Sequence, residues 1–229
     1  MGREFSMNIW AIVPVKPFNR AKSRLASVLS PEQRELLAAA LLERTVRLLL
    51  SVKQIQGVLV ISRDTKALSM AREWGAQTLQ ESGAPELNNA LYRATQALGH
   101  WGADAALIVP ADLPLLAIED VENVLSHVRY QDSIIIAPDR HEHGTNMLLV
   151  RPPGVIPYSF GDNSFAEHRR RAEEAGATIH IYSSERIGLD LDTPADILSY
   201  EELAKTLGEP IIEHIHSNGW LIAEEKPPQ

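Results

Sequence analysis

The sequence contains no cysteine, which excludes several kinds of chemistry at the outset. Disulfide bonds, thiolate metal ligands and a cysteine nucleophile all require that residue. The sequence also has no apolar run that approaches the roughly 20 residues a membrane-spanning helix needs. We therefore expect a cytoplasmic protein that has no membrane partner.

Three phosphate-binding or catalytic motifs are also missing. The sequence has no G-x-x-x-x-G-K-[ST] loop, no G-x-G-x-x-G fingerprint and no G-x-S-x-G elbow. These motifs mark P-loop kinases, dinucleotide-binding proteins and serine hydrolases. All three classes are therefore disfavoured.

Acidic residues are absent from positions 5–31, although the whole chain carries a net charge of -8. The overall negative charge would repel a polyanion, so no nucleic-acid partner is expected. Four cations fall close together in the acid-free segment: Lys16, Arg20, Lys22 and Arg24. This local positive charge predicts an anion-binding site, and the alternative is a solvated basic turn.

Apolar runs alternate with helical patterns along the 229 residues, a length that suits one large domain. Strands are predicted at 9–15, 57–62, 76–80, 105–109, 133–137, 145–150 and 178–182. Helices are predicted at 31–52, 65–74, 86–98, 118–129 and 194–206, with another beginning near 163. The pattern indicates an α/β fold with a mostly parallel sheet and helices on both faces. Because 145–150 follows a polar loop, we expect it to be an antiparallel insertion.

Polar residues that follow the strands are the first candidates for a site, because ligands bind outside the carboxyl ends of parallel strands. The four cations follow the first strand, where they would hold a triphosphate and neutralise charge on a leaving pyrophosphate. Asp112 follows a later strand and is the only charged side chain in a turn with prolines on both sides. A fixed carboxylate suits Mg²⁺, although a lone aspartate is more often a helix cap or a surface charge.

Asp190 and Asp192 are further candidates. In an extended segment, residues two apart share one face, so these carboxylates would lie side by side with Leu191 pointing away. Two such carboxylates repel each other unless a cation lies between them. The alternative is that Asp192 merely precedes the helix cap Thr193 and that Asp190 is solvated. We expect these two aspartates and Asp112 to meet from two strand ends over one edge of the sheet.

A phosphate or carboxylate pocket is predicted around Gly161 and Ser164. Gly161 lets the backbone approach a ligand closely, and Ser164 lies in the first turn of a helix whose free N–H groups attract anions. Helix capping by Asp162 or Asn163 would explain part of this pattern. The His-x-His pair at 141 and 143 has no third ligand nearby in the sequence, so zinc is disfavoured.

Taken together, several segments resemble the CofC/FbiD family, the guanylyltransferases of deazaflavin (coenzyme F-420) biosynthesis. The resemblance spans about 7–206, which is the predicted domain. Residues 1–6 are then an N-terminal extension or an expression remnant, and 207–229 a tail of unknown role. The segments are PVK at 14–16 with RAKSRL at 20–25, PADLP at 110–114, APDR at 137–140, GTN at 144–146, FG at 160–161 with SF at 164–165, and LDLDTP at 189–194.

The resemblance implies a Rossmann-like nucleotidyltransferase fold of the glycosyltransferase-A type, with GTP as substrate and Mg²⁺ as cofactor. The implied nucleotide-binding residues are Lys16, Arg20, Lys22 and Arg24. The implied Mg²⁺ ligands are Asp112, Asp190 and Asp192. The implied catalytic residues are Asp112, Lys16 and Lys22. The residues implied to hold a phosphorylated acid are Thr145, Gly161 and Ser164.

The implied reaction is an in-line attack by a phosphate oxygen of the acid on the α-phosphorus of GTP, which expels pyrophosphate. Bacterial members usually take phosphoenolpyruvate and archaeal members 2-phospho-L-lactate, and 3-phosphoglycerate is also associated with the family. A homodimer and a downstream transferase that uses the labile product are left open. Two other hypotheses also stay open: a nucleotidyltransferase with a sugar-phosphate or molybdopterin acceptor, and a non-catalytic nucleotide-binding module.

Overall fold

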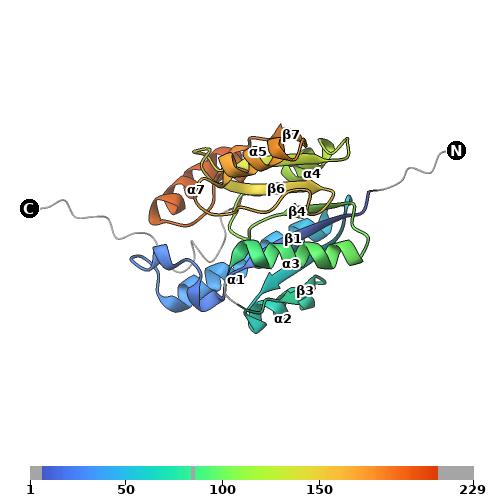
Figure 1. Cartoon of the computed structure of the whole chain (residues 1–229). Helices are drawn as coiled ribbons and strands as arrows, with labels where there is room; N and C mark the ends of the chain where they lie inside the picture. Colours follow the sequence, from blue (N-terminus) through green and yellow to red (C-terminus); the bar gives the residue numbers. More distant parts are fainter. Residues whose placement is uncertain (1–6, 84–85, 211–229) are drawn as a thin grey trace, which may run out of the picture.

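The computed structural model describes residues 7–83 and 86–210, which form a central sheet between layers of helices (Figure 1). The predicted extension at 1–6 lies outside these residues, as do residues 211–229 of the predicted tail. Within the described residues, no helix combines the length and the apolar character needed to cross a membrane.

The sheet has seven strands in the order β3-β2-β1-β4-β6-β5-β7. β6 is antiparallel to both of its neighbours, and every other pair of neighbouring strands is parallel. The predicted antiparallel insertion in a mostly parallel sheet is thereby confirmed. The strands are β1 (Ile9–Val15), β2 (Ile55–Ser62), β3 (Gln77–Gln80), β4 (Ala105–Ile108), β5 (Ser133–Pro138), β6 (Thr145–Arg151) and β7 (Thr178–Ile181).

The helices follow the predicted alternation with small shifts at their ends. The predicted capping box of Ser30 and Gln33 is present at the start of α1. Two 3-10 turns in the basic loop and the short helix α6 were not predicted from the sequence. The helical elements are η1 (Phe18–Arg20), η2 (Ser23–Leu25), α1 (Pro31–Ser51), α2 (Thr65–Glu73), α3 (Leu87–His100), α4 (Ile118–Ser126), α5 (Ser164–Glu174), α6 (Glu185–Gly188) and α7 (Pro194–Leu207).

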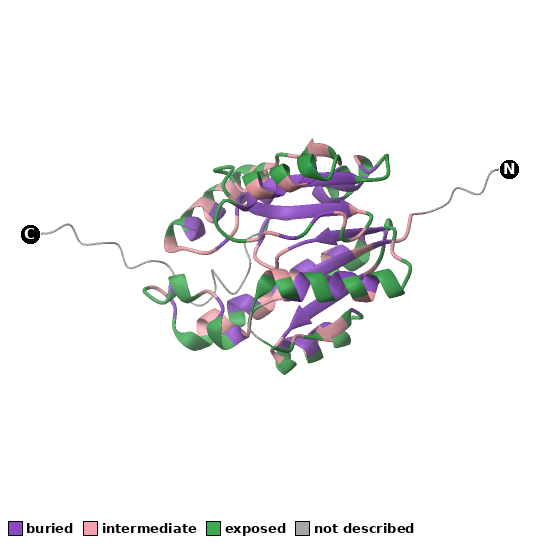
Figure 2. Cartoon of the chain, viewed as in Figure 1, coloured by how far each residue is buried: buried purple, intermediate pink, exposed green. Residues whose placement is uncertain are grey.

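Helices cover both faces of the sheet, and buried residues fill the strands between them (Figure 2). Alternate residues of each strand point to opposite faces, so a strand buried on both sides is apolar throughout. In β6, Leu149 packs into the core beneath α1, α2 and α4, whereas Leu148 packs into the core beneath α3 and α5. The expectation of helices on both faces is confirmed.

The carboxyl ends of six strands meet at one edge of the sheet. β1, β2, β3, β4, β5 and β7 all run in the same direction. β6 runs the other way, and Thr145 at its amino end pairs with Pro138 at the end of β5. The loops that follow these strands and the start of β6 therefore surround one region, where a ligand is expected in such a sheet.

A third, smaller core lies beside this edge and joins loops that are far apart in the sequence. Leu25 comes from the basic loop, Leu115 from the segment after β4, and Leu191 from the segment before α7. They pack against Leu37 of α1 and Tyr200 of α7. We name this set of side chains the loop core, because burying them fixes the basic loop and the aspartate-bearing segments relative to one another.

Two adjacent leucines of α1 test the loop core. Leu37 is fully buried there, whereas Leu36 is 51% exposed. We expect Leu37→Ala to lower the free energy of unfolding by about 2–5 kcal/mol, because it removes buried methyl groups and leaves a cavity. Leu36→Ala, the matched control, should change it by less than about 0.5 kcal/mol. Urea denaturation measures both, and equal losses would show that the loop core is not tightly packed.

Candidate active site

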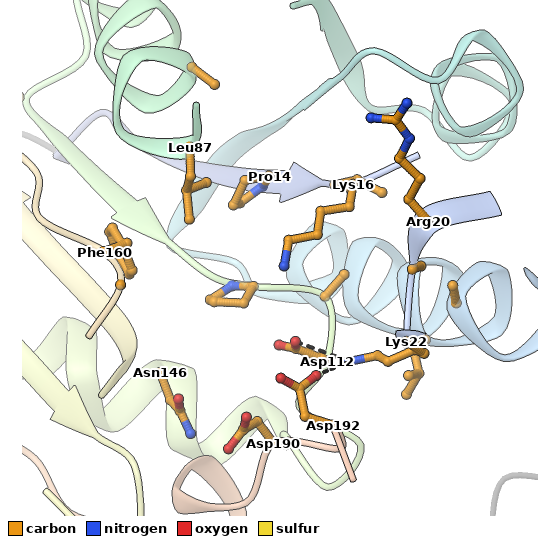
Figure 3. A pocket seen from close by; sticks show the side chains of 18 of the residues that line it. Pro14, Lys16, Arg20, Lys22, Leu87, Asp112, Asn146, Phe160, Asp190 and Asp192 are labelled. Carbon is orange, nitrogen blue, oxygen red and sulfur yellow. Dashed lines mark hydrogen bonds and ion pairs between the residues drawn. The ribbon is translucent and has the colours of Figure 1, made fainter. Parts of the chain in front are cut away.

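A cavity of about 620 Å³ opens at the strand-end edge of the sheet (Figure 3). Its walls come from the loops after β1, β2, β3, β4 and β5, from the start of β6, and from the segments around 160 and 190. The structure brings together in this one cavity all ten residues to which the family resemblance assigned a role: Lys16, Arg20, Lys22, Arg24, Asp112, Thr145, Gly161, Ser164, Asp190 and Asp192.

Lys22 lies between two of the predicted aspartates. Its Nζ donates to Asp112 Oδ2 at 3.1 Å and to Asp192 Oδ1 at 3.0 Å. The lysine side chain is only 8% exposed. Burial alone would lower the pKa of the Lys22 ammonium, but the negative charges of Asp112 and Asp192 raise it above its ordinary value. Lys22 is therefore charged and acts as the internal counter-ion of both carboxylates.

The backbone of the basic loop is fastened on both sides of Lys22. Phe18 is buried and its N–H donates to Asp64 Oδ2 at 2.8 Å, and Leu25 is buried in the loop core. Lys22 itself adopts a left-handed conformation with φ 51°. Such backbone is unfavourable for a residue with a side chain, so it persists only where surrounding contacts impose it. The two anchors and the double ion pair of Lys22 supply those contacts.

The other three cations of the loop are exposed at the rim of the cavity. Figure 3 shows the Lys16 side chain extending into the cavity and the Arg20 guanidinium directed away from the aspartates. Arg24 Nη1 lies 3.7 Å from Asp192 Oδ2, in a side chain that is 73% exposed. Lys16 is therefore oriented toward the centre of the cavity, and Arg24 lies near Asp192, whereas the Arg20 guanidinium points away.

Asp190 lies beside the ion-paired aspartates without sharing their counter-ion. Burial, and then the negative charges of Asp112 and Asp192, raise the pKa of Asp190 to about 6. No described residue forms an ion pair with it, whereas Lys22 pairs with the other two. The site therefore carries negative charge that the protein leaves uncompensated around Asp190.

The segment that carries Asp190 and Asp192 is held directly against the Asp112 turn. The Leu191 N–H donates to the backbone oxygen of Asp112 at 3.0 Å, and the Leu191 side chain is buried. Asp196 then accepts from the backbone N–H groups of Asp192 and Thr193. The expectation that these aspartates follow a strand was wrong, because the segment is irregular and lies between α6 and α7. Tertiary contacts align it instead.

The three carboxylates do not form a complete metal cage. In the part of the chain that the structure describes, no three His, Asp or Glu side chains are grouped so that they could hold a metal ion. Mg²⁺, however, commonly takes only one or two carboxylates and completes its shell with phosphate oxygens and water. The unpaired Asp190 next to Asp112 and Asp192 fits that donor set, so Mg²⁺ at these residues stays a prediction.

Hydroxyl groups line the other side of the cavity, because β6 and β1 lie on opposite sides of β4, the strand that leads to Asp112. Ser164 is buried, and its Oγ accepts from the Thr145 N–H at 2.9 Å. Gly161 has φ 133°, which a residue with a side chain rarely adopts, so glycine is needed there. Asn163 is the N-cap of α5 but makes no capping hydrogen bond with its side chain. Side-chain capping by Asn163 therefore does not explain this segment, and the anion pocket stays a prediction.

Sequence reasoning assigned no role to several residues that build the cavity. Asn88 of α3 holds the Phe160 backbone by two hydrogen bonds, one from its Nδ2 to the Phe160 oxygen and one from the Phe160 N–H to its Oδ1. Asn146 donates to the Ile187 backbone oxygen at 2.8 Å. Arg63 and Glu81, which follow β2 and β3, form an ion pair in the cavity wall. Only their positions directly after strands could have indicated Arg63 and Glu81 from the sequence.

Comparison with known proteins identifies related guanylyltransferases over most of the chain. A family model described as "Guanylyl transferase CofC like" matches residues 9–204. The phosphoenolpyruvate guanylyltransferase of Rubrobacter xylanophilus is 39% identical over 195 residues, which cover 85% of this chain and 94% of that protein. The 2-phospho-L-lactate guanylyltransferase of Methanothermobacter thermautotrophicus is 38% identical over 192 residues, covering 83% of each chain.

Solved structures share the fold at much lower sequence identity. A nucleotidyl transferase from Methanothermobacter thermautotrophicus matches with a TM-score of 0.65 at 15% identity, covering 87% of this chain and 99% of that one. The 4-diphosphocytidyl-2C-methyl-D-erythritol synthase of Anaerococcus prevotii matches with a TM-score of 0.60 at 11% identity, covering 87% and 97%. The fold is therefore that of nucleotidyltransferases. The chain belongs to the CofC-like guanylyl transferase family.

Proposed function

We propose that this chain transfers GMP from GTP to a small phosphorylated carboxylic acid and releases pyrophosphate. The observation that carries the proposal is the composition of one cavity: cations on one wall, hydroxyl groups on the opposite wall and three aspartates between them. A reaction between two phosphates has to overcome their mutual repulsion, and such an arrangement holds both anions at once. The relatives' names, phosphoenolpyruvate and 2-phospho-L-lactate guanylyltransferase, agree with this reaction.

The basic wall suits the GTP phosphates. Lys16 extends into the cavity, and Lys22 holds its ammonium where the aspartates meet. Arg20 and Arg24 are exposed at the rim, where their side chains can reorient toward a polyphosphate. A cation near the β- and γ-phosphates stabilises the charge that develops on the leaving pyrophosphate. We assign Lys16 and Lys22 this catalytic role, and Arg20 and Arg24 a role in nucleotide binding.

Asp112, Asp190 and Asp192 would hold Mg²⁺. When bound, the ion would polarise phosphoryl oxygens and screen the charges of the two substrates. The three carboxylates would fix the position of the ion. Asp112 is itself held by its backbone contact with Leu191 and by its ion pair with Lys22. Thr145, Gly161 and Ser164 would hold the acid on the facing wall, so that its phosphate oxygen attacks the α-phosphorus of GTP in line.

The acceptor is phosphoenolpyruvate or 2-phospho-L-lactate in this proposal. Both acids carry one phosphate and one carboxylate, and relatives named for each are about equally similar to the chain. Either product would feed coenzyme F-420 biosynthesis, and a downstream transferase would consume it in the cytoplasm. A homodimer is compatible with the proposal but is not required, because every site residue named here comes from one chain.

The proposal is tested by incubating the protein with GTP, Mg²⁺ and each acid in turn. We expect pyrophosphate release together with a product whose mass equals the acid plus GMP. Parallel reactions with ATP and CTP test the base preference, and reactions with a sugar phosphate or molybdopterin test the other nucleotidyltransferase hypothesis. GTP binding without pyrophosphate release from any acceptor would instead indicate a non-catalytic module.

Removing one of the aspartates that Lys22 bridges should impair catalysis. We expect Asp112→Ala and Asp192→Ala each to lower kcat by ~10²-fold or more, the usual cost of losing one preorganised electrostatic group. Asp162→Ala is the matched control, because Asp162 is exposed and does not line the cavity, and its kcat should not change. Near-normal kcat in both aspartate variants at saturating Mg²⁺ would refute the metal assignment.

Removing the internal counter-ion should make the free protein more responsive to Mg²⁺. In Lys22→Met, Asp112 and Asp192 lose their shared cation, although side chains that are 30% and 37% exposed are partly screened by water. We expect the melting temperature of Lys22→Met without Mg²⁺ to be roughly 3–6 °C below that of the wild type. Adding Mg²⁺ should then raise the melting temperature of Lys22→Met by more than it raises that of the wild type. Lys53→Met, an exposed lysine, is the control. An equal Mg²⁺ effect in Lys22→Met and wild type would contradict the prediction.

A further inference from the structure

A buried histidine lies directly behind the hydroxyl wall of the cavity. His168 of α5 is fully buried and is not among the residues that line the cavity. Its Nδ1 lies 2.9 Å from Thr145 Oγ1, and its Nε2 accepts from the Ser159 N–H at 3.0 Å. One ring thus links the first residue of β6 with the loop that leads to Gly161. Nothing in the proposed reaction uses this ring directly.

We propose that His168 is a positioning residue that sets the Thr145 hydroxyl as a hydrogen-bond donor to the phosphorylated acid. The inference rests on the proposed function, because it takes the hydroxyl wall as the acceptor site.

The backbone fixes which ring nitrogen carries the proton. A backbone N–H can only donate, so Nε2, which faces the Ser159 N–H, has to be the unprotonated nitrogen. In a neutral imidazole the remaining proton is then on Nδ1. The Nδ1–H therefore donates to Thr145 Oγ1, which accepts.

The surroundings of the ring keep it neutral. Burial, and then the positive charge of Arg171, lower the pKa of His168 to about 4, although Glu167 acts in the opposite direction. The ring also packs against Phe160 in a T-shaped arrangement, with ring centroids 4.9 Å apart. At neutral pH the ring therefore carries one proton, and the contact with Ser159 decides where it lies.

The consequence is a wall of hydroxyl donors. Because Thr145 Oγ1 accepts from His168, its own hydrogen is free to point elsewhere, and no described residue accepts it. Ser164 has the same polarity, because its Oγ accepts from the Thr145 N–H. Both residues line the cavity. Two O–H donors side by side complement a phosphate or carboxylate, whereas the opposite tautomer would make Thr145 donate to the ring and present lone pairs to the anion.

Two substitutions of His168 separate the roles of its nitrogens. His168→Asn places an amide N–H near the position of Nδ1 and keeps a donor to Thr145, whereas His168→Gln places its amide near the position of Nε2 and loses that donor. We expect His168→Gln to raise the KM for phosphoenolpyruvate or 2-phospho-L-lactate by ~10-fold or more, and His168→Asn to raise it by less than about 3-fold. The KM for GTP should not change in either variant.

A double-mutant cycle tests whether the effect passes through Thr145. Thr145→Val removes the hydroxyl but keeps the branched shape, so His168→Gln should raise the acceptor KM no further in that background. An equal increase with and without the Thr145 hydroxyl would overturn the inference, because His168 would then act only as a structural residue. Thermal melting of each variant checks that loss of folding is not what is measured.

The proton position can also be read in the unaltered protein, so the inference stays testable if His168→Gln does not fold. The ¹⁵N chemical shifts of labelled histidine at pH 7 should show a neutral ring with its proton on Nδ1. A proton on Nε2, or a charged ring, would overturn the inference.

Failure of the inference and failure of the proposed function give different results. If the wild type releases pyrophosphate but both variants keep its acceptor KM, only the role of His168 is wrong. If the wild type releases none with any acid, the proposed function is wrong. Calorimetric binding of phosphoenolpyruvate to wild type, His168→Asn and His168→Gln then decides the role of His168, and undetectable binding to the wild type would overturn both.

Discussion

The site depends on one electrostatic arrangement: a buried ammonium between two carboxylates, with a third carboxylate left uncompensated beside them. Lys22 reaches Asp112 and Asp192 from a loop that is 90 and 170 residues away in the sequence, and it holds both at about 3 Å. Without a counter-ion, carboxylates this close would repel each other. The loop core makes the arrangement possible, because Leu25 and Leu191 fix the backbone on both sides of it.

The two walls of the cavity then have separate tasks. The basic loop presents the exposed cations Lys16, Arg20 and Arg24 to a polyphosphate, whereas the facing wall presents hydroxyl groups whose hydrogen bonds are fixed from behind. Exposed lysine and arginine side chains can adjust to a flexible triphosphate, but an acid of a few atoms needs donors that are already oriented. The reversed direction of β6 matters here, because it places Thr145 at the same edge as the strand ends that carry the charges.

Much of the fold and the composition of the site could be predicted from the sequence. Alternating apolar and amphipathic segments indicated the strands and helices, and the prolines around Asp112 marked it as a fixed carboxylate. The placement of 189–192 could not be predicted, because no strand holds it and its position depends on Leu191 packing in the loop core. The role of His168 could not be predicted either, because it depends on contacts with Thr145 and Ser159 that only the folded chain brings to this helix.

Lys22, the three aspartates and the ion they would hold balance the charges of two anionic substrates that bind in the same cavity. The most direct test of this balance is a crystal structure of the protein with a non-hydrolysable GTP analogue, phosphoenolpyruvate and Mn²⁺ in place of Mg²⁺. We predict anomalous density for Mn²⁺ in contact with Asp190 and at least one of Asp112 and Asp192, with the acid against Thr145 and Ser164. Nucleotide and acid bound in this cavity with no ion at these carboxylates would contradict this charge balance.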